Sequence, residues 1–171
     1  VDGVLFNKSR TTLIQCPGGK TGSYVIPEGV TNIEGSAFAG CTNLTAITVT
    51  VPNSLYSTRD GVLFDASQTT LIQYPGGKAG NYTIPNGVTC IGPEAFRACA
   101  RLTNVTIGNS ITNVGFWAFY DCRSLTGVYF KGDAPDDAWF AFPEATTATV
   151  YYLPGTVGWG PTFGGRPTAP W

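Results

Sequence analysis

Histidine and methionine are absent from this 171-residue chain, and charged residues make up only 12% of it. Without histidine, the chain lacks the commonest general base and the commonest metal ligand. Ten basic and eleven acidic residues give a formal net charge of −1, so we expect no nucleic-acid partner. No apolar run approaches the roughly 18 residues of a membrane-spanning helix, and no leader pattern precedes Val1, so we expect a soluble chain. Because Val1 stands where a start methionine would, we expect a processed or trimmed chain.

Residues that favour strands and turns are abundant. The chain holds 22 glycines and 12 prolines, threonine is frequent, and 43% of the residues are hydrophobic. A chain of this length and composition can bury one ordinary core without disulfide bonds. The composition therefore predicts a mainly β domain.

Two internal periods organise the sequence. The string DGVLF at residues 2–6 recurs at 60–64, and TTLIQ at 11–15 recurs at 69–73, which gives a period of 58. A shorter shift of 23 residues superimposes nine apolar positions between 84 and 130. Periods of 20–29 residues are typical of leucine-rich repeats, in which each coil buries its apolar face only against a neighbour. The sequence therefore predicts a short solenoid.

Each repeat predicts its own local structure. The unit I-P-x-G-V-T-x-I-x-x-x-A-F-x-x-C-x-x-L-T-x-V-x-I occupies 26–49 and 84–107, with a weaker copy at 107–130. Alternation in its last third predicts a half-buried strand. The patterns around the polar tips at 7–10 and 65–68 predict β-hairpins. We expect the Ala-Phe pair to lie on a short helical turn, with Pro93 early in it and Ser36 as a cap. Three phenylalanines are expected to stack: Phe38, Phe96 and Phe119.

The strings IPEGV at 26–30, AFAGC at 37–41, IPNGV at 84–88, AFRAC at 95–99 and AFYDC at 118–122 resemble the BspA-like leucine-rich-repeat family of bacterial and protist surface proteins. The expected fold is mainly β: a short leucine-rich-repeat solenoid with interspersed hairpins, short helical turns and a C-terminal Gly/Pro/aromatic cap. The solenoid should occupy 1–130, with hairpin-plus-coil units at 2–49 and 60–107 and a third coil at 107–130. Residues 131–171 should form a degenerate final coil and the cap. In that coil the shift of 23 places Val128 on Tyr151 and Phe130 on Leu153.

Residues that could carry chemistry have structural interpretations. Cysteines 41, 99 and 122 share one repeat position and are expected to be buried thiols, while Cys16 and Cys90 leave a disulfide open as an alternative. No C-x-x-C pair exists, so we expect no metal and no cofactor. The Gly-Gly-Lys turns have Ile14 and Ile72 where a phosphate loop needs its first glycine. The acidic residues at 133–137 are expected to begin a short helix, with calcium binding as the alternative.

The strand surfaces remain as candidate sites. One expected ladder joins Thr48, Thr106 and Tyr129, and a second joins Thr50, Gly108 and Lys131. The candidate ligand-binding residues are Thr48, Thr50, Thr106, Tyr129, Lys131, Trp117 and Tyr120. The resemblance implies a non-catalytic, extracellular or cell-surface module that binds a protein or a glycan in adhesion.

An alternative function is self-assembly, in which copies of the chain join head to tail into a filament or array. The candidate contact residues are Val1, Val4, Phe6, Trp159 and Trp171. For Trp159 and Trp171, packing in the core or cap is the competing interpretation.

Overall fold

In the computed structural model, which describes residues 3–136, 138 and 140–171, the chain folds into strands and turns, and the described part contains no helix. The mainly β solenoid is therefore confirmed. Consistently, no described segment is a helix long and apolar enough to cross a membrane. The strands are β1 (Leu5–Phe6), β2 (Thr12–Gln15), β3 (Thr21–Ile26), β4 (Asn32–Ile33), β5 (Asn43–Val49), β6 (Tyr56–Arg59), β7 (Val62–Asp65), β8 (Thr70–Gln73), β9 (Gly80–Thr83), β10 (Cys90–Ile91), β11 (Leu102–Ile107), β12 (Asn113–Val114), β13 (Gly127–Phe130), β14 (Thr149–Tyr152), β15 (Thr162–Phe163) and β16 (Arg166–Pro170).

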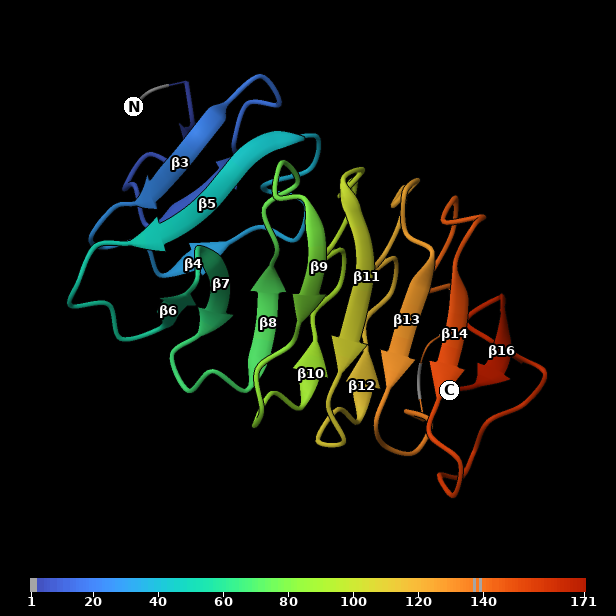
Figure 1. Cartoon of the computed structure of the whole chain (residues 1–171). Helices are drawn as coiled ribbons and strands as arrows, with labels where there is room; N and C mark the ends of the chain where they lie inside the picture. The colour runs from blue at the N-terminus through green and yellow to red at the C-terminus, as the bar shows by residue number, and fades with distance from the viewer. Residues whose placement is uncertain (1–2, 137, 139) are drawn as a thin grey trace.

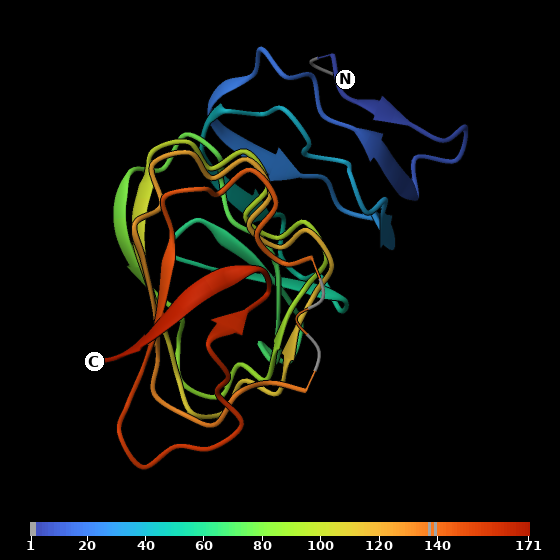
Figure 2. The ribbon, with the colours of Figure 1, turned by 90° about the vertical axis from the view of Figure 1, so that its right-hand side faces the viewer.

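Successive coils place their strands side by side in two main sheets (Figure 1). The larger sheet has the order β15-β16-β14-β13-β11-β9, and its pairs from β9 to β16 are parallel. The other sheet has the order β12-β10-β8-β7-β6. Figure 2 shows the later coils nearly superimposed when viewed along the solenoid. The parallel register repeats surface positions from coil to coil, which creates rows of equivalent side chains.

Alternation along each strand sorts side chains between the core and the surface. In β11, Leu102, Val105 and Ile107 are fully buried, whereas Thr106 faces outward. Aromatic rings extend the core in a column: Tyr74 to Phe96 at 5.1 Å between centroids, Phe96 to Phe119 at 4.8 Å, and Phe119 to Phe142 at 4.9 Å. The expected stacking of Phe96 on Phe119 is confirmed.

The expected place of Phe38 in that column is wrong. Phe38 lies in a separate core, 6.2 Å from the ring of Tyr24. The column continues instead through Tyr74 on one side and Phe142 on the other. The separation arises because the second hairpin lies between the first coil and the later ones.

The Ala-Phe segment forms no helical turn, contrary to the expectation from Pro93 and Ser36. Left-handed residues flank the pair, with φ of 56° at both Glu94 and Ala98. Alternate N–H groups point to the next coil: Phe96 donates to the carbonyl of Ala118 at 2.7 Å, whereas Arg97 closes a local turn onto the carbonyl of Glu94 at 2.9 Å. Bonds between coils and single three-residue turns therefore replace the i to i+4 bonds of a helix. The left-handed positions recur at Trp117, Asp121, Phe140 and Glu144.

Strand β7 joins the two hydrophobic cores. Its Leu63 packs into the core of residues 4–47, while its Val62 and Phe64 pack into the core of the later coils. All three side chains are fully buried. In Figure 1 the first unit, with β3 and β5, runs obliquely to the strands of the larger sheet. The solenoid therefore bends at the second hairpin.

The final coil differs from its expected register by one residue. Val128 pairs with Val150 and Phe130 with Tyr152, rather than with Tyr151 and Leu153. Ala148, which is buried in the core, directly precedes β14, whereas one residue separates the equivalent Leu125 from β13 in the coil before it. After it, β15 and β16 form an antiparallel hairpin, and β16 adds to the sheet beside β14.

Candidate binding surface

The outward face of the larger sheet carries two rows of uncharged side chains. Strand pairing aligns the members of each row across the coils. The first row is Thr83, Thr106, Tyr129, Tyr151 and Ala169. The second row is Asn81, Asn104, Gly127 and Thr149. The face therefore offers amides, hydroxyls and aromatic rings at strand spacing.

Hydrogen bonds between coils fix the two asparagines. Asn104 Nδ2 donates to Asn81 Oδ1 at 2.9 Å, and Thr103 Oγ1 donates to the same oxygen at 2.9 Å. Thr126 Oγ1 donates to Asn104 Oδ1 at 3.3 Å. These bonds set the direction of both amide planes, so the polar part of the surface is organised before any ligand arrives.

Three aromatic rings adjoin the asparagines. The rings of Tyr129 and Tyr151 are stacked 4.8 Å apart, and Trp171 lies tilted at 58° to Tyr129, with 5.1 Å between centroids. The Trp171 backbone N–H donates to the Tyr152 carbonyl at 2.9 Å, which holds the tryptophan at the sheet. Trp171 is 48% exposed. The rings thus form an apolar corner open to solvent.

Gly127 makes room for this arrangement. A Cβ at Gly127 would lie 2.5 Å from Tyr129 Cε2 and 2.7 Å from Asn104 Oδ1. The Tyr129 ring can therefore lie over the strand beside Asn104 only because residue 127 has no side chain. Next to this ring lies a hollow of about 280 Å³, lined by Asn81, Asn104, Thr106, Tyr129 and Trp171.

The structure brings together only part of the predicted ladders. Thr106 and Tyr129 are paired neighbours, but Thr48 lies on β5 next to Val25 in a different sheet. The expected contact of Thr48 with the later rungs is therefore wrong. The second hairpin interrupts the ladder: the Ile47 N–H donates to the Gly61 carbonyl at 2.7 Å.

The second ladder is interrupted in the same way. Lys131 follows β13 beside β11, and its N–H donates to the Ile107 carbonyl. Thr50 follows β5 and donates to the Ile26 carbonyl in the first unit. Lys131 therefore lies at the end of the larger sheet, whereas Thr50 belongs to the first unit.

Trp117 and Tyr120 lie elsewhere, in an aromatic cluster on the turns. Trp117 stacks on Phe116 at 4.7 Å, and Phe116 meets Phe140 edge to face at 6.2 Å. The Arg97 guanidinium lies 5.1 Å from the Tyr120 ring and pairs with Glu94 at 2.6 Å. The arginine is thus already matched by a carboxylate within the chain, so the cluster presents mainly rings.

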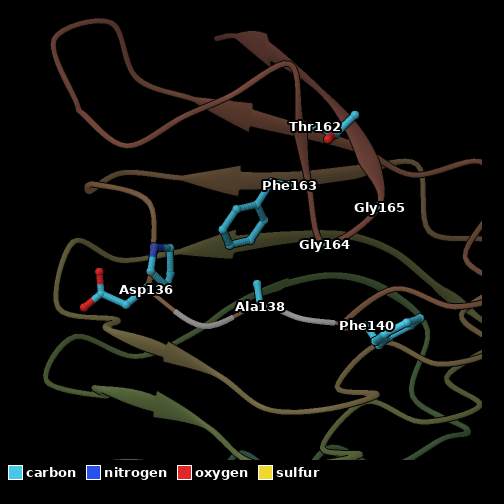
Figure 3. Close-up of a pocket in the computed structure, with 8 residues that line it drawn as sticks. Asp136, Ala138, Phe140, Thr162, Phe163, Gly164 and Gly165 are labelled. Carbon is cyan, nitrogen blue, oxygen red and sulfur yellow. The ribbon is translucent and has the colours of Figure 1, made fainter.

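A second hollow, with a volume of about 430 Å³, lies near the C-terminal hairpin (Figure 3). Its lining is mainly apolar, with one carboxylate, and consists of Pro135, Asp136, Ala138, Phe140, Thr162, Phe163, Gly164 and Gly165. No helix begins at 135–136, contrary to expectation. Asp133 instead accepts a hydrogen bond from the Val157 N–H at 2.8 Å, and Asp137 lies outside the described residues. Among the described residues, no group of acidic or cysteine side chains is placed to hold a metal.

The five cysteines are free thiols, and all but Cys90 are buried. The pKa of Cys16 is lowered by a hydrogen bond with Cys41, and that same bond raises the pKa of Cys41. Burial raises the pKa of Cys99 and of Cys90. Buried thiols of this kind serve packing rather than nucleophilic chemistry.

The residues predicted for self-assembly have mixed positions. Val4 is buried in the first core, and Phe6 packs against that core. Trp159 contacts Phe130 at 5.0 Å between ring centroids, and Trp171 borders the hollow of the larger sheet. Val1 lies outside the described residues.

Sequence reasoning missed Asn81, Asn104 and Tyr151 in the outward rows. The string N-x-T occurs at 81–83 and again at 104–106, and the same shift of 23 superimposes the two. That repetition of a surface motif was the available indication. The shift of 23 aligned Tyr151 with Val128, whereas it pairs with Tyr129, because the final coil is one residue shorter than the coil before it.

Residues 18–79 and 74–157 match the BspA type leucine rich repeat region, with six copies of the repeat. The chain belongs to this family. No curated protein matches the chain. Among solved structures, a leucine-rich repeat protein from Eubacterium ventriosum is 20% identical with a TM-score of 0.57, covering 83% of this chain and 48% of its own.

Two further structures share the fold of this BspA-type chain. The pneumococcal vaccine antigen PcpA is 20% identical with a TM-score of 0.61, covering 77% of this chain and 38% of its own. A leucine-rich cell surface protein from Faecalibacterium prausnitzii is 24% identical with a TM-score of 0.56, covering 79% and 46%. The chain thus spans less than half the length of each of these proteins.

Proposed function

We propose that this BspA-type solenoid is a non-catalytic binding module of an extracellular or cell-surface protein and acts in adhesion. The observation that carries the proposal is the pair of uncharged rows on the outward face of the larger sheet, where Asn104, Tyr129 and Trp171 surround a hollow. Repeat solenoids use such extended faces for recognition. The family match and the surface-protein description of the Faecalibacterium prausnitzii relative support the location.

The test is a screen of immobilised matrix proteins and glycans with the wild-type chain and two variants. The double substitution Thr106→Glu with Tyr129→Glu places two carboxylates on the proposed face and should abolish saturable binding. The matched control is Thr89→Glu, because Thr89 is an exposed threonine beside β10 in the other sheet. Equal binding by all three proteins would contradict the proposal.

A second candidate function is self-association, and the observation that favours it is the edge strand β3. Among the described strands, β3 pairs only with β5, and its Val25 is 53% exposed. Unprotected strand edges template pairing with another chain. The substitution Val25→Lys should then abolish polymers seen by light scattering and electron microscopy. A wild-type chain that stays monomeric at high concentration would exclude this function.

A further inference from the structure

The hollow on the larger sheet combines features that together select one class of ligand. Its five lining residues include two asparagine amides, one threonine and two aromatic side chains, and none carries a charge. The two outward rows around it are also uncharged; the first runs from β9 to β16 and the second from β9 to β14. Lys131 follows β13 beyond both rows. A phosphate, a sulfated chain or an acidic peptide would find no cation among the lining residues to offset the loss of its hydration. The ligand that fits is therefore neutral.

An extended peptide does not fit this surface well. Asn81 lies on β9, the last strand of the sheet, but Asn104, Thr106 and Tyr129 lie on β11 and β13, which are paired on both sides. Most of the hollow therefore lies over strands with no free edge for main-chain pairing, which gives peptides much of their affinity on sheets. The lining also holds no deep apolar pocket for an anchoring side chain.

The polar and apolar halves of the hollow face each other. Asn81 Oδ1 already accepts two hydrogen bonds, so Asn81 offers a ligand its NH₂ donors, whereas Asn104 keeps one N–H donor and one acceptor position. Thr106 adds a hydroxyl. The rings of Tyr129 and Trp171 meet at a tilt of 58° and form the apolar wall. A pyranose has the matching chemistry, because its hydroxyls form hydrogen bonds at the rim while its C–H groups pack on an aromatic face.

We propose that this hollow binds a neutral sugar unit of a glycan. Asn81 and Asn104 bond to ring hydroxyls, and Tyr129 and Trp171 contact the C–H face. At about 280 Å³ the hollow is slightly below the usual range for small-ligand pockets, which suits one or two sugar units. The inference rests on the proposed binding function and names the ligand class of that same surface.

The experiment uses neutral oligosaccharides of glucose, mannose, galactose, xylose and N-acetylglucosamine, with heparin and polygalacturonate as charged comparisons. Binding is measured by calorimetry and by NMR shifts of the asparagine side-chain amides. At least one neutral oligosaccharide should bind and shift the Asn81 and Asn104 amides. Asn104→Ala and Tyr129→Ala should each weaken that binding about tenfold.

Matched variants separate the site from the fold. Tyr129→Phe keeps the ring and should retain most of the affinity. Gly127→Ala removes no binding group but displaces the Tyr129 ring, so it should weaken binding. Thr89→Ala alters only an exposed threonine beside β10 in the other sheet and should leave binding unchanged. Circular dichroism melts show whether each variant is folded.

Three results would overturn the glycan proposal. They are binding of charged chains alone, unchanged binding by Asn104→Ala and Tyr129→Ala, and absence of binding to every oligosaccharide. If a matrix protein still binds and the Thr106→Glu, Tyr129→Glu variant loses it, the surface is a protein-binding site and the proposed function stands without the sugar. If that variant loses nothing, both proposals fail.

Discussion

At the scale of single residues, the thiols differ in their access to reagents. Cys90 is partly exposed, whereas Cys99 and Cys122 are fully buried. Because burial and the nearby Asp65 carboxylate raise the pKa of Cys90, its reactive thiolate is scarce at neutral pH. We expect iodoacetamide to modify Cys90 first, slowly, at a rate that keeps rising with pH beyond the ordinary thiol range. Peptide mass spectrometry checks this, and early modification of Cys99 or Cys122 would contradict it.

The same scale shows which site residues were predictable. Thr106 and Tyr129 follow from strict alternation along a strand, and the structure places them as neighbours. The role of Gly127 did not follow, because a missing side chain matters only once the Tyr129 ring is seen to lie over it. Trp171 enters the hollow through the pairing of β16 with β14, a contact that no repeat in the sequence encodes.

At the scale of elements, the two hairpin tips bind the backbone N–H groups of their turns with different side chains. Asn7 Oδ1 accepts from the Thr12 N–H at 3.1 Å, and in the second copy Asp65 Oδ1 accepts from the Thr70 N–H at 2.8 Å. Burial raises the pKa of Asp65, but hydrogen bonds from Ser67, Thr70 and Thr69 outweigh burial, so the net pKa lies below its usual value. The carboxylate form therefore contributes stability above the unfolded pKa, and this is lost as pH falls through the folded pKa.

The substitution Asp65→Asn should consequently reproduce the first hairpin. We expect the free energy of unfolding at pH 7 to stay within about 1 kcal/mol of wild type and to fall less steeply in acid. Asp65→Ala removes the acceptors and should cost about 1–3 kcal/mol at pH 7. Urea unfolding at pH 7 and pH 3 measures both. A loss with asparagine as large as with alanine would show that the charge itself is required.

Strands and hairpins were predictable because period-2 alternation and turn residues are local properties of the sequence. The turns around Ala95 and Phe96 were not predictable, because glutamate and alanine, at positions 94 and 98, do not favour a left-handed backbone. Non-glycine residues tolerate that conformation here because each coil is held by bonds to the next. Local propensity favoured a helical turn, and stacking of the coils overrode it.

At the scale of the whole molecule, the two cores should open separately. The first core has less than half as many buried side chains as the second and lacks the column of stacked rings. Solenoid stability is close to a sum over units and their interfaces. The shift of 58 predicts two similar units. It does not predict that they have separate cores, with the strand β7 packed into both of them. We therefore expect the first unit to open at lower denaturant than the later coils.

Four buried cysteines report on this opening without added labels. Cys16 and Cys41 lie in the first core, and Cys99 and Cys122 lie in the second. In a Cys90→Ser background, pulse alkylation across a urea series should modify the first pair at a lower midpoint than the second pair. The lowered pKa of Cys16 favours its reactive thiolate, so this thiol reacts as soon as the core admits the reagent.

Two truncations then test which core each midpoint belongs to. Leu63→Ala removes the β7 side chain that packs into the first core, and should lower the Cys16 and Cys41 midpoint by the equivalent of about 2–4 kcal/mol. Phe119→Ala removes the middle of the ring column and should lower the Cys99 and Cys122 midpoint by a comparable amount. If all four thiols shift together in both variants, β7 couples the cores into one cooperative unit, because a local cavity would then be felt equally on both sides of the strand.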